Sequence, residues 1–145
     1  MKLTLNAALP YTRQVAYKGL RPRDIVIWES FIKRFPDAFD FVWYDTVLGD
    51  PTRPGDDEAA MKAGGAYQVM QWRIDVIGSK GDFLYIVEIK PDALAGALGQ
   101  VLAYKALLIN EGRISPDVRC MVLTDSLSPI TEKAAGLLGV TILVP

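Results

Sequence analysis

Residues 73–104 read RIDVIGSKGDFLYIVEIKPDALAGALGQVLAY, and this stretch decides the fold. β-Branched and aromatic residues fill two runs, which are separated by the short glycine-containing segment GSKGD. That pattern is typical of two strands joined by a tight turn, with Lys80 in the turn. From Ala93 onward the chain is rich in alanine and leucine, which predicts a helix as far as Asn110. The stretch therefore predicts a β-hairpin followed by a helix.

Charged side chains gather at one end of this hairpin. Glu88 and Lys90 lie on one face of the second strand, because side chains alternate with period two. Taken alone, they could form an ion pair of little energetic worth. Asp75 on the first strand reaches the same end if the register of the turn allows it. Asp75, Glu88 and the carbonyl of Ile89 would then offer Mg²⁺ or Mn²⁺ the oxygen ligands that these ions prefer, with Lys90 placed to orient an attacking water.

Composition narrows the chemistry further. The chain has 145 residues, half of them hydrophobic, with no histidine and one cysteine, Cys120. Catalysis by a Ser-His-Asp or Cys-His arrangement, a His- or Cys-ligated zinc and an intramolecular disulfide are therefore excluded. No transmembrane run and no signal-peptide core are present, so we expect a cytoplasmic protein without a membrane partner. Cys120, Trp28, Trp43 and Trp72 are expected in the core, although Trp43 and Tyr44 could stack on a base.

The length and the absence of linkers predict one α/β domain over residues 1–145. Helices are predicted at 22–36, 93–110 and 128–138, and strands at 39–47, 67–77, 83–90, 118–124 and 140–144. The prolines, glycines and acids of about 48–66 predict a mobile surface loop. Right-handed crossovers after the hairpin would make the sheet mixed.

The motif Asp75, then Glu88-Ile89-Lys90 after a gap of thirteen, resembles the PD-(D/E)XK nuclease superfamily. The proline that often precedes the first Asp is replaced by Ile74. The resemblance implies a restriction-endonuclease-like αβββαβ core with a mixed sheet flanked by helices, here with a C-terminal αβ extension. It also implies hydrolysis of phosphodiester bonds in DNA with Mg²⁺ or Mn²⁺, with Asp75, Glu88 and Lys90 as catalytic residues.

The following helix resembles that of RecB-like nucleases, which carry a Gln-x-x-x-Tyr motif. Gln100 and Tyr104 are four residues apart and share a helix face. The resemblance implies that both face the active site and contact the DNA backbone. Alternatively, Gln100 faces solvent and Tyr104 lies at the edge of the core. Gly96 and Gly99 would let this helix approach the strands or a phosphate closely.

The superfamily also implies a metal-ligating glutamate on the first helix, which would be Glu29. A surface pair with Lys33, four residues on, is the alternative explanation of Glu29. Asp45, near the end of the first strand of the core, is a spare ligand.

Charge is segregated along the chain. The first 34 residues carry a net +5, the next 24 carry −6, and the remainder is neutral. The basic segment could contact phosphate, through Lys18, Arg21 and Arg23, and the acidic one could gather metal. These segments could equally be solvated faces that mix once the chain folds.

The sequence thus predicts a small metal-dependent deoxyribonuclease. With no room for a recognition domain, we expect it to select branched DNA or DNA ends, or to rely on a partner or a homodimer. A Holliday junction resolvase and a nuclease of a mobile element or phage both agree with this size. The alternative is a binding or structural module on the same fold that has lost catalysis. Near-neutral charge favours this alternative, whereas intact Asp75, Glu88 and Lys90 oppose it.

Overall fold

The computed structural model describes residues 7–48, 72–114 and 117–145. The elements in these ranges are β1 (Leu9–Pro10), α1 (Pro22–Arg34), β2 (Phe41–Val47), β3 (Arg73–Lys80), β4 (Phe83–Ile89), α4 (Ala95–Asn110), β5 (Val118–Leu123), α5 (Pro129–Leu138) and β6 (Val140–Leu143). The predicted αβββαβ order with its αβ extension is confirmed, and the short β1 precedes it. The predicted acidic loop at 48–66, apart from Leu48, and the start of the predicted strand 67–77 lie outside the described residues.

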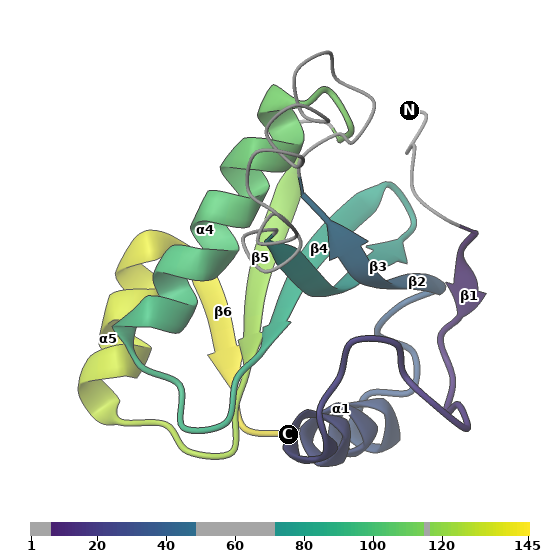
Figure 1. The fold of residues 1–145 in the computed structure, drawn as a ribbon. Coiled ribbons are helices and arrows are strands. Elements are labelled where there is room, and N and C mark those ends of the chain that lie inside the picture. Colours follow the sequence, from purple (N-terminus) through teal and green to yellow (C-terminus); the bar gives the residue numbers. More distant parts are fainter. Residues whose placement is uncertain (1–6, 49–71, 115–116) are drawn as a thin grey trace, which may run out of the picture.

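The six described strands form one mixed sheet in the order β1-β2-β3-β4-β5-β6. The pairings from β1 to β4 are antiparallel, whereas β4–β5 and β5–β6 are parallel. Helices α4 and α5 make the two crossovers and lie on one side of the sheet, and α1 lies on the other (Figure 1). The mixed α/β architecture expected from the sequence is therefore present, and both faces of the sheet are used for packing.

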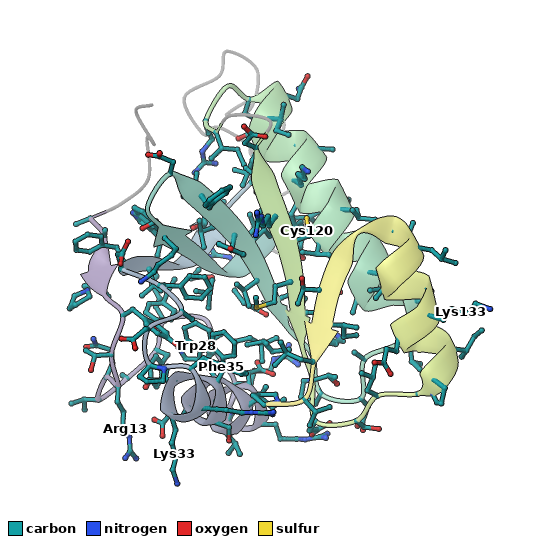
Figure 2. All side chains as sticks on the ribbon, turned by 180° about the vertical axis from the view of Figure 1, so that it is seen from behind. Arg13, Trp28, Lys33, Phe35, Cys120 and Lys133 are labelled. Carbon is teal, nitrogen blue, oxygen red and sulfur yellow. The ribbon has the colours of Figure 1, made fainter. Side chains whose placement is uncertain are left out.

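An aromatic cluster holds α1 against the sheet. Trp28 is fully buried, its ring stacks on Phe31 at a centroid distance of 5.5 Å, and its Nε1–H donates to the hydroxyl of Tyr44 at 2.9 Å. Figure 2 shows Trp28 on the side of α1 that faces the strands. Burying such rings contributes roughly 1.5–3 kcal/mol each, so this cluster fixes the position of α1 over β2 and its neighbours.

The β3–β4 hairpin is tighter than the sequence suggested. Lys80 pairs with Phe83, so Lys80 belongs to the strand, and the turn consists of Gly81 and Asp82 alone. Gly81 adopts a φ of +55°, which favours glycine. Further along β3, a Cβ on Gly78 would lie 2.6 Å from the ring of Phe39, so no larger residue fits there without movement.

The three tryptophans do not share one environment. Trp28 is in the core, as predicted, and Trp43 is partly buried against the α4 side of the sheet. The prediction for Trp72 was wrong, because its side chain is 53% exposed just before β3 begins. Cys120 is buried, as expected, with its Sγ 3.6 Å from the carbonyl oxygen of Val101.

None of the helices in the described ranges has the length and apolar character needed to cross a bilayer.

Candidate functional site: a buried carboxylate pair

The site begins with the register of β3 and β4. Val76 pairs with Val87 at the end of the ladder, and one further step along this register brings Asp75 opposite Glu88. The backbone N–H of Ile89 donates to Oδ2 of Asp75 at 2.8 Å. That hydrogen bond holds the Asp75 side chain across the end of β4. The expected meeting of Asp75 with the Glu88 end of the hairpin therefore occurs.

Both carboxyl groups are withdrawn from water. Glu88 is 6% exposed, and its Oε2 is the one buried side-chain nitrogen or oxygen in the described ranges without a hydrogen-bond partner. Burial is the largest cause that raises the pKa of Glu88, to about 8, and the charge of Asp75 adds to it. Burial likewise raises the pKa of Asp75, to about 6, against the hydrogen bond from Ile89, which lowers it. An unpartnered buried carboxylate is costly, so this pair calls for a proton or a cation.

Lys90 is a basic residue within electrostatic reach of the pair. Its ammonium lowers the pKa values of both Asp75 and Glu88, although burial outweighs it. Lys90 itself is exposed, and its backbone N–H donates to the carbonyl of Leu123 at 2.8 Å, which anchors the end of β4. The Glu88-Ile89-Lys90 segment thus presents a carboxylate inward and an ammonium at the surface.

Helix α4 covers this pair with the two residues predicted from the Gln-x-x-x-Tyr motif. The Nε2 of Gln100 donates to the hydroxyl of Tyr104 at 3.2 Å. Burial raises the pKa of Tyr104 to about 12, and the charge of Glu88 contributes next. Tyr104 is 5% exposed, so it is both part of the core and close to the pair. Tyr104 therefore lies within electrostatic reach of Glu88, and Gln100 is hydrogen-bonded to it.

The glycines of α4 do not serve to bring the helix close to the strands. A Cβ at Gly96 or Gly99 would meet nothing within 4 Å. The prediction that these glycines let the helix approach the strands closely was therefore wrong. They leave an open helix surface beside Gln100.

An acidic residue of α1, Asp24, lies within electrostatic reach of the pair. Its charge raises the pKa values of both Asp75 and Glu88. Its Oδ2 accepts a hydrogen bond from the backbone N–H of Arg21 at 3.0 Å. The sequence contained the signal for it, because Asp24 precedes the buried Ile27 and Trp28 by three and four residues and therefore shares their helix face.

Glu29, the predicted ligand on α1, has other partners. Its Oε2 lies 3.2 Å from Nε of Arg13, and its Oε1 accepts from the hydroxyl of Tyr17 at 3.3 Å. Figure 2 shows Arg13 and Lys33 projecting outward, away from the strands. Glu29 is thus not brought together with Asp75 and Glu88, nor does the structure show the alternative pair with Lys33.

Asp45 is close to the pair but already neutralised. It is buried, its Oδ2 lies 2.7 Å from Nη1 of Arg73 and 3.9 Å from Nζ of Lys18, and its charge raises the pKa of Asp75. Gly19 makes room for it, since a Cβ there would lie 2.7 Å from Oδ1 of Asp45. These cations make Asp45 a structural anchor beside the pair.

The predicted phosphate contacts are largely engaged with the protein itself. The guanidinium of Arg23 lies 3.2 Å from Asp92 and 2.9 Å from Asp125. The backbone N–H of Asp92 also donates to Asp125 at 2.9 Å. Arg23 therefore ties the start of α1 to the loops that follow β4 and β5. Arg21, the third predicted contact, is exposed at the start of the same helix.

A divalent cation fits the pair. In the described part of the chain, no group of three or more His, Cys, Asp or Glu residues is placed to hold a metal ion. Mg²⁺ nevertheless needs only one or two carboxylates, since it retains waters and takes further oxygens from a phosphate substrate. The unpartnered oxygen of Glu88 and the raised pKa values of both acids fit such an ion. The carbonyl of Ile89 stays a predicted ligand.

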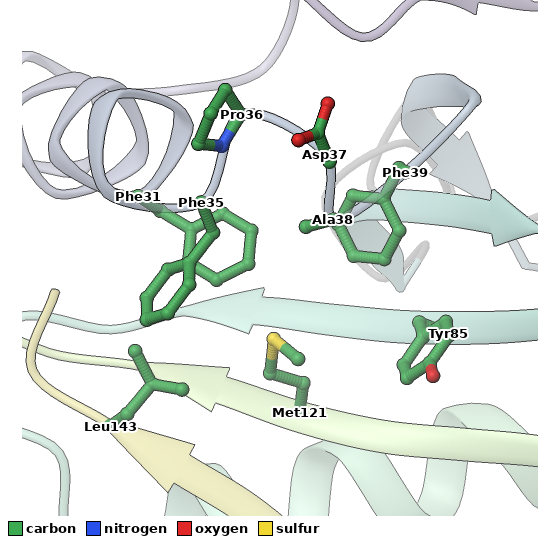
Figure 3. Close-up of a pocket in the computed structure, with 9 residues that line it drawn as sticks. All are labelled: Phe31, Phe35, Pro36, Asp37, Ala38, Phe39, Tyr85, Met121 and Leu143. Carbon is green, nitrogen blue, oxygen red and sulfur yellow. The ribbon is translucent and has the colours of Figure 1, made fainter.

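A separate concavity lies on the α1 side of the sheet. It encloses about 520 Å³ and is lined mainly by Phe31, Phe35, Phe39, Tyr85, Met121 and Leu143 (Figure 3). None of the predicted site residues lines it. Its lining is almost wholly apolar, so it does not extend the carboxylate site.

Comparison with known proteins concerns the fold. No protein-family model and no curated protein matches the chain. Among solved structures, it is similar to EndoMS in a complex with double-stranded DNA (18% identity, TM-score 0.47, covering 92% of this chain and 50% of that one). It is also similar to a repair endonuclease from Pyrococcus abyssi, with 18% identity and a TM-score of 0.44 over 67% of this chain and 49% of that one. A protein of unknown function is similar with 12% identity and a TM-score of 0.50 over 79% of this chain and 53% of that one. The chain spans about half the length of each.

The raised pKa values predict how stability depends on pH. Between the ordinary pKa of a glutamate, near 4.5, and the native value of about 8, the folded state binds more protons than the unfolded state. Stability of the metal-free protein therefore falls as the pH rises from about 5 to about 8. Because the chain has no histidine, no imidazole titrates in this range.

Thermal unfolding in EDTA at several pH values measures this dependence. The melting temperature of wild type should fall by several degrees across the range, and Glu88→Gln should flatten the fall. At pH 8, Mg²⁺ should raise the melting temperature of wild type and leave that of Glu88→Gln nearly unchanged. The matched control is Asp82→Asn in the exposed hairpin turn, which should behave as wild type. A melting temperature that rises with pH, identically in wild type and Glu88→Gln, would contradict the raised pKa values.

Proposed function

We propose that this chain is a divalent-metal-dependent nuclease that hydrolyses phosphodiester bonds in DNA. The observation that carries the proposal is the unpartnered, buried Oε2 of Glu88 beside Asp75 at the end of the β3–β4 hairpin. The spacing of Asp75 and Glu88-Ile89-Lys90, and the αβββαβ order in which they sit, support it. A structural module with no use for a cation would gain stability by replacing such a pair.

Asp75 and Glu88 would hold Mg²⁺ or Mn²⁺, and Asp24 on α1 would add negative charge within electrostatic reach of them. When bound, the ion supplies positive charge that stabilises a phosphate under attack and acidifies a nearby water. Lys90, exposed at the end of β4, would orient the attacking water with its ammonium.

Gln100 and Tyr104 would position the substrate. Their mutual hydrogen bond leaves the second N–H of the Gln100 amide as a donor toward a phosphate oxygen. The open surface at Gly96 and Gly99 allows a nucleic-acid backbone to approach α4 there. Because Lys18 and Arg23 are engaged with carboxylates, we assign the contact with the substrate chiefly to α4 and Lys90.

The proposal has three finer parts. The enzyme selects branched DNA or DNA ends, it acts as a homodimer, and it comes from a mobile element or phage. A panel of linear duplex, single-stranded and four-way-junction DNA distinguishes the substrate classes. Sedimentation of the protein with and without junction DNA distinguishes a monomer from a dimer.

Lys90→Ala tests the proposed chemistry. Wild type should cleave at least one DNA of the panel in Mg²⁺ or Mn²⁺ and none in EDTA, and Lys90→Ala should be slower by roughly 100-fold or more. Lys80→Ala is the matched control, because Lys80 lies at the other end of β3, where its Nζ is 3.2 Å from Asp40. The rate is measured from labelled fragments on a gel. Absence of cleavage by folded wild type in both metals would refute the catalytic proposal and favour a binding module.

Asp24→Asn and Glu29→Gln separate the two acids of α1. Because Asp24 acts on the carboxylate pair and Glu29 pairs with Arg13, only Asp24→Asn should weaken metal binding. We expect it to raise the Mg²⁺ concentration for half-maximal cleavage by about 10-fold. Metal titrations of the cleavage rate measure this. The opposite ranking of the two variants would return the role to Glu29.

A further inference from the structure

Trp72 is a large aromatic residue left at the surface beside the carboxylate site. Its side chain is 53% exposed. Its ring meets that of Tyr104 edge-on, with centroids 6.2 Å apart and an angle of 64° between the planes. Tyr104 in turn feels the charge of Glu88. An exposed indole thus lies one ring away from the proposed reaction centre.

The backbone at Trp72 is held in place. Its carbonyl oxygen accepts a hydrogen bond from the N–H of Leu48 at 2.9 Å, next to the end of β2. The following residue, Arg73, is paired with the buried Asp45 at 2.7 Å, and Ile74 is fully buried. Asp75 comes next, so the indole is attached three residues from a proposed metal ligand by an anchored stretch of strand.

The other exposed aromatic residues differ from Trp72 in place or in partner. The rings of Phe35 and Phe83 are covered by the guanidinium groups of Arg34 and Arg119, at 5.2 and 4.4 Å from their centroids. Phe41 is 52% exposed but pairs with Ser79, at the opposite end of β3 from Asp75. Of the exposed aromatic residues in the described ranges, Trp72 is therefore the one whose ring face is uncovered and lies near the site.

From these observations we propose that Trp72 stacks on an unpaired base of the substrate and so directs the enzyme to DNA with a single-stranded segment at the site. The proposal rests on the proposed function and names its substrate class. Every base has a π-face, so stacking on an indole is strong and tolerant of sequence. Within an intact duplex each base is already stacked on its neighbours, and Trp72 gains a partner only where a base is free.

Equilibrium binding tests this without cleavage. A fluorescent 12-nucleotide single strand and the same strand in a blunt duplex are titrated with protein in EDTA. Trp72→Ala should weaken binding of the single strand by about 5-fold to 100-fold and leave the duplex within about twofold. Trp72→Phe should restore part of the loss, because a smaller ring still stacks. Phe41→Ala is the matched control and should bind both DNAs as wild type does.

The outcomes separate this inference from the proposed function. Weaker binding of the single strand alone by Trp72→Ala, with partial rescue by Trp72→Phe, supports the stacking role of Trp72. That support holds even if wild type cleaves nothing in Mg²⁺, a result that would overturn only the proposed hydrolysis. Equal effects on single strand and duplex, no effect on either, or no binding of the single strand by wild type would overturn the inference. If Trp72→Ala affects both DNAs equally or neither of them, the proposed hydrolysis by wild type is unaffected. Circular dichroism of each variant confirms that the fold is retained.

Discussion

The antiparallel register between β3 and β4 places two carboxyl groups opposite each other, at the end of a hairpin and largely out of water. Because Val76 pairs with Val87, Asp75 and Glu88 must meet, and a shift of the register by one residue would turn one of them to the other face. The short Gly81-Asp82 turn and the close fit of Gly78 under Phe39 hold this register. The free-energy cost of burying two carboxylates follows directly from this register. The surrounding residues act on the pair through their charges and hydrogen bonds.

The two layers of helix meet this pair from different sides. Helix α4 brings Tyr104, whose pKa is raised in part by Glu88, and Gln100 bonded to it. Helix α1 is set on the sheet by the aromatic cluster around Trp28 and tied to the loops after β4 and β5 by Arg23, which brings Asp24 within electrostatic reach. Packing that stabilises the fold therefore also determines the charge around the pair.

Much of this could be predicted from local patterns. Alternation along the strands, the glycines of the hairpin and the four-residue spacing of Gln100 and Tyr104 are short-range signals. They predicted the order of elements and the meeting of Gln100 with Tyr104 on one face of α4. Tertiary ion pairs leave no such signal. The side-chain partners of Glu29 and Arg23 lie 12 to 102 residues away in sequence, so local spacing does not reveal these contacts.

Exposure of a tryptophan is equally hard to predict, because hydrophobicity favours burial and only the ends of the neighbouring elements decide otherwise. Trp72 lies just before β3, and its side chain is 53% exposed there. The placement of Asp24, by contrast, could have been predicted from the sequence, since Asp24 lies on the same helix face as Ile27 and Trp28. Its short side chain in the first turn of α1 is equally explained by capping, and Asp24 does accept a hydrogen bond from the N–H of Arg21.

The buried and unpartnered carboxylate of Glu88 requires a proton or a cation. The carboxyl carbon of Glu88, observed by NMR in isotopically labelled protein, reports its ionisation directly. We expect the Glu88 carboxyl to titrate near pH 8 in metal-free protein, and to be ionised already at pH 6 once Mg²⁺ is added. A titration near the ordinary value of 4.5, unchanged by Mg²⁺, would contradict it.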